Sequence, residues 1–152
     1  MRNSNTILEI MLGDHTIIES FLINFKDNLS KDIEFAEKSF DEFKWVLEKH
    51  IFVEEKVMFR FCDSLTSEMC KIVQGLTKDH SKMLEMLNEI RNKLVINKEI
   101  DISNFQELLI DHKRTEETTL YPELDQILNK EQKEIMIAQI NEIPLEKEID
   151  EI

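Results

Sequence analysis

The chain has 152 residues, of which 41% are hydrophobic and 34% charged, a size and composition typical of one folded globular domain. It contains only two glycines and two prolines, which argues against many short strands joined by tight turns and favours a few long helices. The net charge of −13 repels phosphate backbones and anionic lipids, so we expect neither nucleic acid nor a membrane as partner.

The cellular compartment is predicted from two features that the sequence does not show. No run of 18 apolar residues and no secretion signal is visible, which predicts a cytoplasmic protein without a membrane span. Cys62 and Cys70 are eight residues apart and flanked by hydrophobic residues, a spacing that fits neither a CxxC redox motif nor a zinc knuckle. We expect both to be reduced thiols in or near the core.

Apolar residues recur at three- and four-residue steps in four long stretches, which predicts four long helices. The breaks between them are short, so neighbouring helices should be antiparallel and form an all-α, up-and-down four-helix bundle. A fifth, shorter helix and an acidic tail should follow, with a domain boundary near residue 130. The predicted helices are 5–28, 31–62, 67–96, 102–128 and 131–142, the bundle domain is 1–130, and the C-terminal helix and tail are 131–152.

The second and fourth predicted helices repeat each other. A shift of 62 residues superimposes the histidine, the two following glutamates and an aromatic residue of the second helix on those of the fourth. A shift of 65 residues likewise places Asp14-His15 on Asp79-His80. The repeat therefore predicts two similar helical hairpins, each with two histidines.

Each long helix carries one histidine on its apolar seam, in chain order His15, His50, His80 and His112. Two residues of an antiparallel hairpin share a level when they are equally far from its turn. The midpoints between successive histidines are 32.5, 65 and 96, at or beside the predicted breaks. We therefore expect all four imidazoles in one layer, about 24 Å from the turns.

Two glutamates, Glu54 and Glu116, lie on the same seams, four residues after His50 and His112. Burying an unpaired carboxylate costs several kcal/mol, and the seams hold no Lys or Arg at this level. Neutral imidazoles and bridging carboxylates suit iron, manganese or zinc. The sequence therefore predicts a metal site made of His15, His50, Glu54, His80, His112 and Glu116. A metal-free bundle whose polar layer only sets helix register is the alternative.

The segments HIFVEEKVMF and HKRTEETTLYP, together with His15 and His80, resemble the hemerythrin family, also called the HHE cation-binding domain. The resemblance covers about residues 10 to 128. It implies a non-haem di-iron centre with an oxo or hydroxo bridge, in which His15 and His50 hold one iron and His80 and His112 the other. Glu54 and Glu116 would bridge the two irons, and an open coordination position would bind O2, NO or peroxide.

The oxygen-carrying members of this family have a further histidine where this chain has Leu84. The ligand set is instead similar to that of sensor-like members and of di-iron proteins that respond to nitric oxide and repair iron centres. We expect a protein that binds or senses O2, NO or iron, and signals, if at all, through a protein partner at the fifth helix or tail. The alternative is an enzyme that turns over nitric oxide or peroxide or repairs iron centres.

Residues around the expected ligands are assigned mainly to packing or solvent. Glu19, one turn after His15, is either an extra ligand or solvated at the bundle edge. We expect Glu55 and Glu117 in solvent, although either could orient a ligand. We expect Phe59 and Tyr121 to serve packing rather than chemistry, although the hydroxyl of Tyr121 could reach a bound ligand or a proton path.

Overall fold

The computed structural model describes residues 6–142, without the side chains of residues 62–64, so the predicted acidic tail lies outside the described residues. Within this range the chain is helical and contains no strand, which confirms the all-α prediction. The elements are α1 (Ile7–Leu29), α2 (Ile33–Val53), the π-helix η1 (Glu54–Met58), the 3-10 helix η2 (Phe59–Ser64), α3 (Ser67–Val95), α4 (Ser103–Thr115), the π-helix η3 (Glu116–Leu120), α5 (Tyr121–Ile127) and α6 (Lys130–Glu142).

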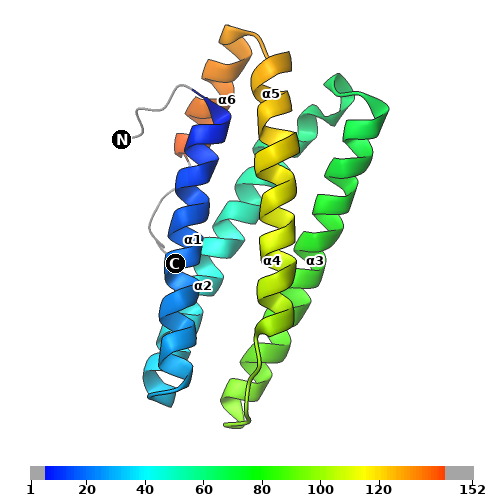
Figure 1. The fold of residues 1–152 in the computed structure, drawn as a ribbon. Coiled ribbons are helices and arrows are strands. Elements are labelled where there is room, and N and C mark those ends of the chain that lie inside the picture. Colours follow the sequence, from blue (N-terminus) through cyan, green and yellow to red (C-terminus); the bar gives the residue numbers. More distant parts are fainter. Residues whose placement is uncertain (1–5, 143–152) are drawn as a thin grey trace.

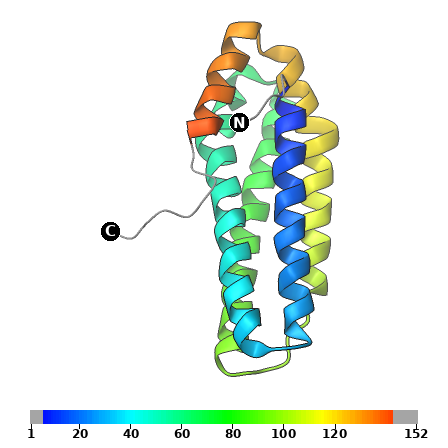
Figure 2. The same ribbon diagram turned by 90° about the vertical axis from the view of Figure 1, so that its left-hand side faces the viewer.

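The long elements run side by side along the length of the molecule (Figures 1 and 2). The second predicted helix is α2 continued by η1 and η2, and the fourth is α4 continued by η3 and α5. We call α1, α2, η1 and η2 the first half, and α3, α4, η3 and α5 the second half. The fifth predicted helix, α6, folds back over one end of the bundle, where Met136 and Ile140 are buried. The four-helix bundle with a short C-terminal helix is therefore confirmed.

The first turn of α1 is tied to α5, near the other end of the sequence, by one carboxylate. Thr6 caps α1 by accepting a hydrogen bond from the backbone N–H of Glu9. The two oxygens of Asp125, on α5, accept from the backbone N–H groups of Ile7 and Leu8 at 2.8 and 3.1 Å. An N-terminal turn leaves such N–H groups without helical partners, so Asp125 fixes α1 against α5.

A π-helical turn interrupts each half at the same place. The backbone N–H of Phe59 donates to the carbonyl of Glu54, and that of Tyr121 donates to the carbonyl of Glu116, each five residues earlier. Single π turns within α-helices are frequently found at functional sites. The internal repeat seen in the sequence thus extends to the backbone.

The buried apolar side chains form two clusters, one toward each end of the bundle. Met11, Val53 and Leu76 belong to the cluster near α6, whereas Ile18 and Leu47 belong to the cluster near the turns that join α1 to α2 and α3 to α4. The helices pass from one cluster to the other through a layer of buried polar side chains, which holds the site described below.

The prediction of a reduced thiol is wrong for Cys70, which is disulfide-bonded, while the side chain of Cys62 lies outside the described residues. The first turns of α3 pack beside η2, and hydrophobic flanks alone could not reveal that proximity. Between residues 6 and 142, no helix has the length and apolar composition needed to cross a membrane.

Candidate metal centre

The four predicted imidazoles and two predicted carboxylates meet in one buried layer. Each histidine is at most 5% exposed, and both glutamates are 0% exposed. Their donor atoms form two overlapping groups, and within each group the atoms lie within 4.8 Å of one another. The common layer expected from the midpoints is therefore confirmed. The groups are His15, His50, Glu54 and Glu116, and Glu54, His80, His112 and Glu116.

The two glutamates are shared because each lies close to histidines of both groups. Oε1 of Glu116 is 3.1 Å from Nε2 of His15, whereas its Oε2 is 2.9 Å from Nε2 of His112. Oε1 of Glu54 is 3.0 Å from Nε2 of His80. Each glutamate therefore has carboxylate oxygen within 3.5 Å of histidines of both groups.

Among the described residues, the basic groups that form ion pairs with Glu54 and Glu116 are all imidazoles. Burial lowers the pKa of His50, but the interactions of this ring with Glu54 and Glu116 together outweigh burial and raise the pKa to about 10. Burial also lowers the pKa of His112, but hydrogen bonds with Glu116 and Glu54 raise it to about 11. Without metal, protons on these rings therefore supply the missing positive charge.

The donor set fits a metal ion better than it fits a hydrogen-bonded core. His50 has both ring nitrogens buried without a hydrogen-bond partner among the described residues, and its Nε2 is 3.5 Å from the nearest oxygen of Glu54. The Nε2 atoms of His80 and His112 face each other at 3.2 Å. Convergent imidazole nitrogens and carboxylate oxygens suit iron, manganese or zinc, so these residues could hold such ions.

Three imidazoles are held from behind by further carboxylates through their Nδ1 atoms. A hydrogen bond of this kind fixes the ring orientation and the tautomer of a metal-binding histidine. Glu55 and Glu117 follow the alternative in which each orients a ligand, because these partly exposed side chains turn inward instead of lying wholly in solvent. The pairs are His15 with Glu117 at 2.6 Å, His80 with Glu55 at 2.7 Å, and His112 with Asp79 at 2.9 Å.

Tyr121 belongs to the site and not only to the packing around it. This fully buried side chain donates from its hydroxyl to Oε2 of Glu54 at 2.5 Å and to Oε1 of Glu116 at 3.0 Å. Burial and the two carboxylates raise the pKa of Tyr121 well above its ordinary value. Its repeat equivalent, Phe59, stacks on the ring of His80, so only Phe59 keeps the packing role predicted for both.

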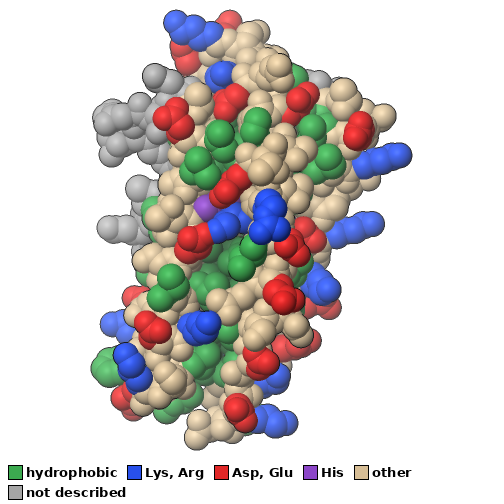
Figure 3. Space-filling view, viewed as in Figure 1, with side chains coloured by type: hydrophobic (Ala, Val, Ile, Leu, Met, Phe, Trp, Pro, Cys, Tyr) green, Lys and Arg blue, Asp and Glu red, His purple; other side chains and the backbone are tan. Residues whose placement is uncertain are grey.

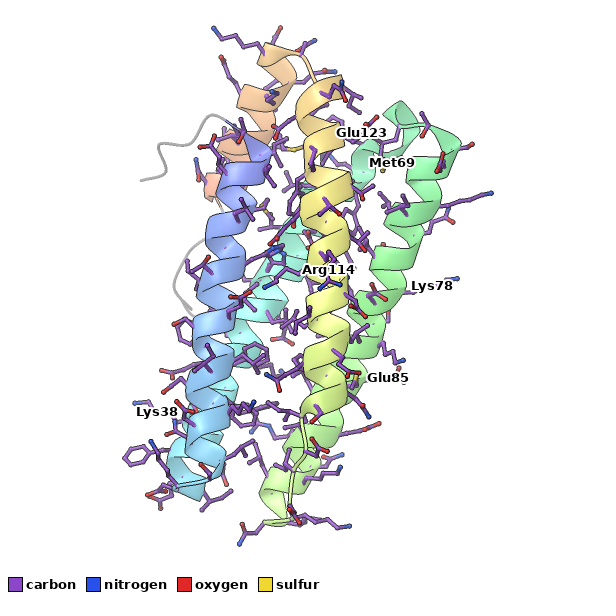
Figure 4. All side chains as sticks on the ribbon, in the orientation of Figure 1. Lys38, Met69, Lys78, Glu85, Arg114 and Glu123 are labelled. Carbon is purple, nitrogen blue, oxygen red and sulfur yellow. The ribbon has the colours of Figure 1, made fainter. Side chains whose placement is uncertain are left out.

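Glu19 is in neither donor group. It forms an ion pair with Lys113 on α4, and both line a cavity of about 10 Å³, which has room for about one water-sized molecule. Figure 3 shows histidine surface about halfway along the molecule, flanked by acidic and basic side chains. Arg114, two residues after His112, marks this level on α4 in Figure 4.

The comparisons with known proteins agree with this geometry. The family model described as Hemerythrin HHE cation binding domain matches residues 6–124, a range that contains every residue of both donor groups. The comparisons with curated proteins and with solved structures gave no match.

Proposed function

Because this chain belongs to the hemerythrin HHE cation-binding family, we propose that it is a non-haem di-iron protein that binds or senses a small ligand such as O2 or NO. The observation that carries this proposal is the pair of overlapping donor groups that share Glu54 and Glu116. Six protein donors are too many for one tetrahedral site, and shared carboxylates allow two adjacent metal positions. Imidazole and carboxylate donors also accommodate manganese and zinc, but bound iron would supply ligand binding and redox chemistry.

In this proposal His15 and His50 hold one iron, His80 and His112 hold the other, and the two glutamates span both. The carboxylates behind three of the rings keep those Nε2 atoms directed at the metals. The small cavity lined by His15, His50 and Met83 would receive the ligand. Its size favours a diatomic molecule over a larger substrate.

The test is anaerobic reconstitution with ferrous iron, followed by metal analysis and spectra on addition of O2, NO and peroxide. We expect about two irons per chain and a spectral change with at least one of the three reagents. One zinc per chain with no iron uptake would contradict the proposal, and no metal at all would favour the structural bundle. Repeated consumption of NO or peroxide would instead identify an enzyme, which uses the same residues.

The binding partners and the cellular compartment are further predictions. A protein partner would contact α6 or the acidic tail, nucleic acid would not bind, and the protein would act in the cytoplasm. Thiols are kept reduced in that compartment, so the Cys70 disulfide would have to open there.

A further inference from the structure

Tyr121 places one oxygen atom among the proposed ligands of a single metal position. Its hydroxyl lies 2.5 Å from Oε2 of Glu54, 3.0 Å from Oε1 of Glu116 and 3.2 Å from Nε2 of His15. These three residues, with His50, form one of the two donor groups. No other tyrosine exists in the chain.

These distances are those of hydrogen bonds, and they also match the separation expected between neighbouring ligands of one metal ion. Metal bonds to nitrogen and oxygen are about 2.0–2.2 Å long, so two donors at right angles around a shared ion are about 3 Å apart. The hydroxyl of Tyr121 contacts three donors of one group at once, so a metal ion bound by that group would lie within reach of this oxygen. The phenol oxygen of Tyr121 therefore stands at a corner of the coordination shell that includes His15.

Among the residues that the structure describes, the other donor group has no tyrosine oxygen beside it. The repeat equivalent of Tyr121 is Phe59, whose ring stacks on His80 with the two planes 3° apart and the centroids separated by 5.6 Å. A phenyl ring offers no donor atom to a metal. The repeat therefore makes the two positions similar in histidines and glutamates but different at this residue.

We propose that Tyr121 is a seventh protein ligand, which binds through its phenolate oxygen to the iron held by His15 and His50. This inference rests on the di-iron function proposed above. When the oxygen–iron bond forms, the O–H bond of Tyr121 breaks and the proton leaves to solvent, as expected when a metal displaces protons from its ligands. An anionic oxygen donor suits ferric iron, for which tyrosine is a known axial ligand in haem proteins.

The experiment compares the ferric, iron-loaded wild-type protein with Tyr121→Phe, which keeps the ring and removes the oxygen. We expect a visible phenolate-to-iron charge-transfer band in the wild type and its loss in the variant. Excitation within this band should enhance the ring vibrations of a tyrosinate in the resonance Raman spectrum. Because the chain has one tyrosine, such a signal can come only from Tyr121.

Metal content and melting temperature are measured on both proteins, so that a misfolded variant is recognised. Wild-type protein with two irons but no such band would overturn the inference and leave the di-iron proposal standing. A band that persists in Tyr121→Phe would overturn it as well. Wild-type protein that takes up no iron would defeat the di-iron proposal itself, and this inference with it.

Discussion

The two halves of the bundle present the same ligands but support them differently. His50 and Glu54 of the first half correspond to His112 and Glu116 of the second, and both glutamates open a π-helical turn. The hydrogen bonding of the Nδ1 atoms of these two histidines differs. Nδ1 of His112 is bonded to Asp79, whereas Nδ1 of His50 has no hydrogen-bond partner among the described residues.

Residues of each half also contact a histidine of the other half. Glu117 and Tyr121 of the second half contact His15 of the first, whereas Phe59 of the first half stacks on His80 of the second. The repeat thus brings together two overlapping donor groups, and the residues around them give the two groups different surroundings. The experiments below test how far the halves act as one unit and how far they differ.

The largest effect is expected from removing a residue that both positions share. Glu54→Ala should abolish binding of both metals, because Glu54 belongs to both donor groups, whereas His80→Ala should spare the position of His15 and His50. Metal content per chain, measured by mass spectrometry, checks this. Glu48→Ala, a change at a partly exposed glutamate on α2, is the control and should keep both metals. Equal losses in Glu54→Ala and His80→Ala would contradict separate positions.

Metal should also hold the two halves together. A chelator should lower the melting temperature, because a ligand at 100 times its Kd stabilises the folded state by about 2.7 kcal/mol, which corresponds to about 5–10 °C for a domain of this size. Differential scanning calorimetry with and without chelator measures the shift. The control is Glu54→Ala/Glu116→Ala, whose melting temperature the chelator should leave unchanged. If the chelator also left the melting temperature of the wild type unchanged, the polar layer would be stable without metal.

A smaller, pH-dependent effect should appear in metal-free protein and should involve both halves alike. The pKa values of His50 and His112 rise from 6.5 to about 10 and about 11 on folding. Their stabilising contribution is therefore complete below about pH 6.5 and is lost as the pH rises through those folded values. The free energy of unfolding, measured with urea, should fall from pH 7 to pH 11.

His50→Gln/His112→Gln is the matched variant for that measurement, and it should show a flatter pH profile than the metal-free wild type. If wild-type stability increased over this range, the two imidazoles would not carry protons in the metal-free protein.

The smallest expected effect is a difference in metal affinity between variants of two aspartates that the repeat makes equivalent, Asp79 and Asp14. Asp79→Asn should weaken metal binding about 10- to 100-fold, the usual cost of losing a carboxylate behind a ligand histidine. Asp14→Asn should cost less, because Asp14, although it lines a small pocket with His50, is not hydrogen-bonded to Nδ1 of that ring. Competition titrations against a metal indicator compare the two affinities. Equal losses would mean that metal-loaded protein is more symmetric than the structure described here.

The sequence predicted the helices and the ligand layer because both depend on regular spacing. Seam positions recur every three or four residues, and short turns fix which levels coincide, so the four histidines could be aligned from their midpoints alone. Spacing could not decide whether Glu55 and Glu117 lie in solvent or orient a ligand. Each lies one position off the seam, where regular helical spacing points a side chain away from the core.

For a related reason the sequence favoured packing for Tyr121 over the alternative that its hydroxyl reaches the site. In an α-helix, a residue five positions after Glu116 lies about 140° around the axis from it, so the two side chains should diverge. A π turn closes its hydrogen bond between residues five apart and brings the later residue back above the earlier one. Only the sequence similarity of the two halves hinted at this, because Phe59 follows Glu54 at the same distance.

The π turns also limit how this centre could be transplanted into a designed scaffold. A design that copies the six ligands onto ideal straight helices reproduces the histidine layer, because those residues precede or open the turn. It would rotate every later residue of α5 and η2 out of phase and lose the hydroxyl beside Glu54. A faithful graft must therefore include the irregular turn, although idealised backbones are usually preferred in design.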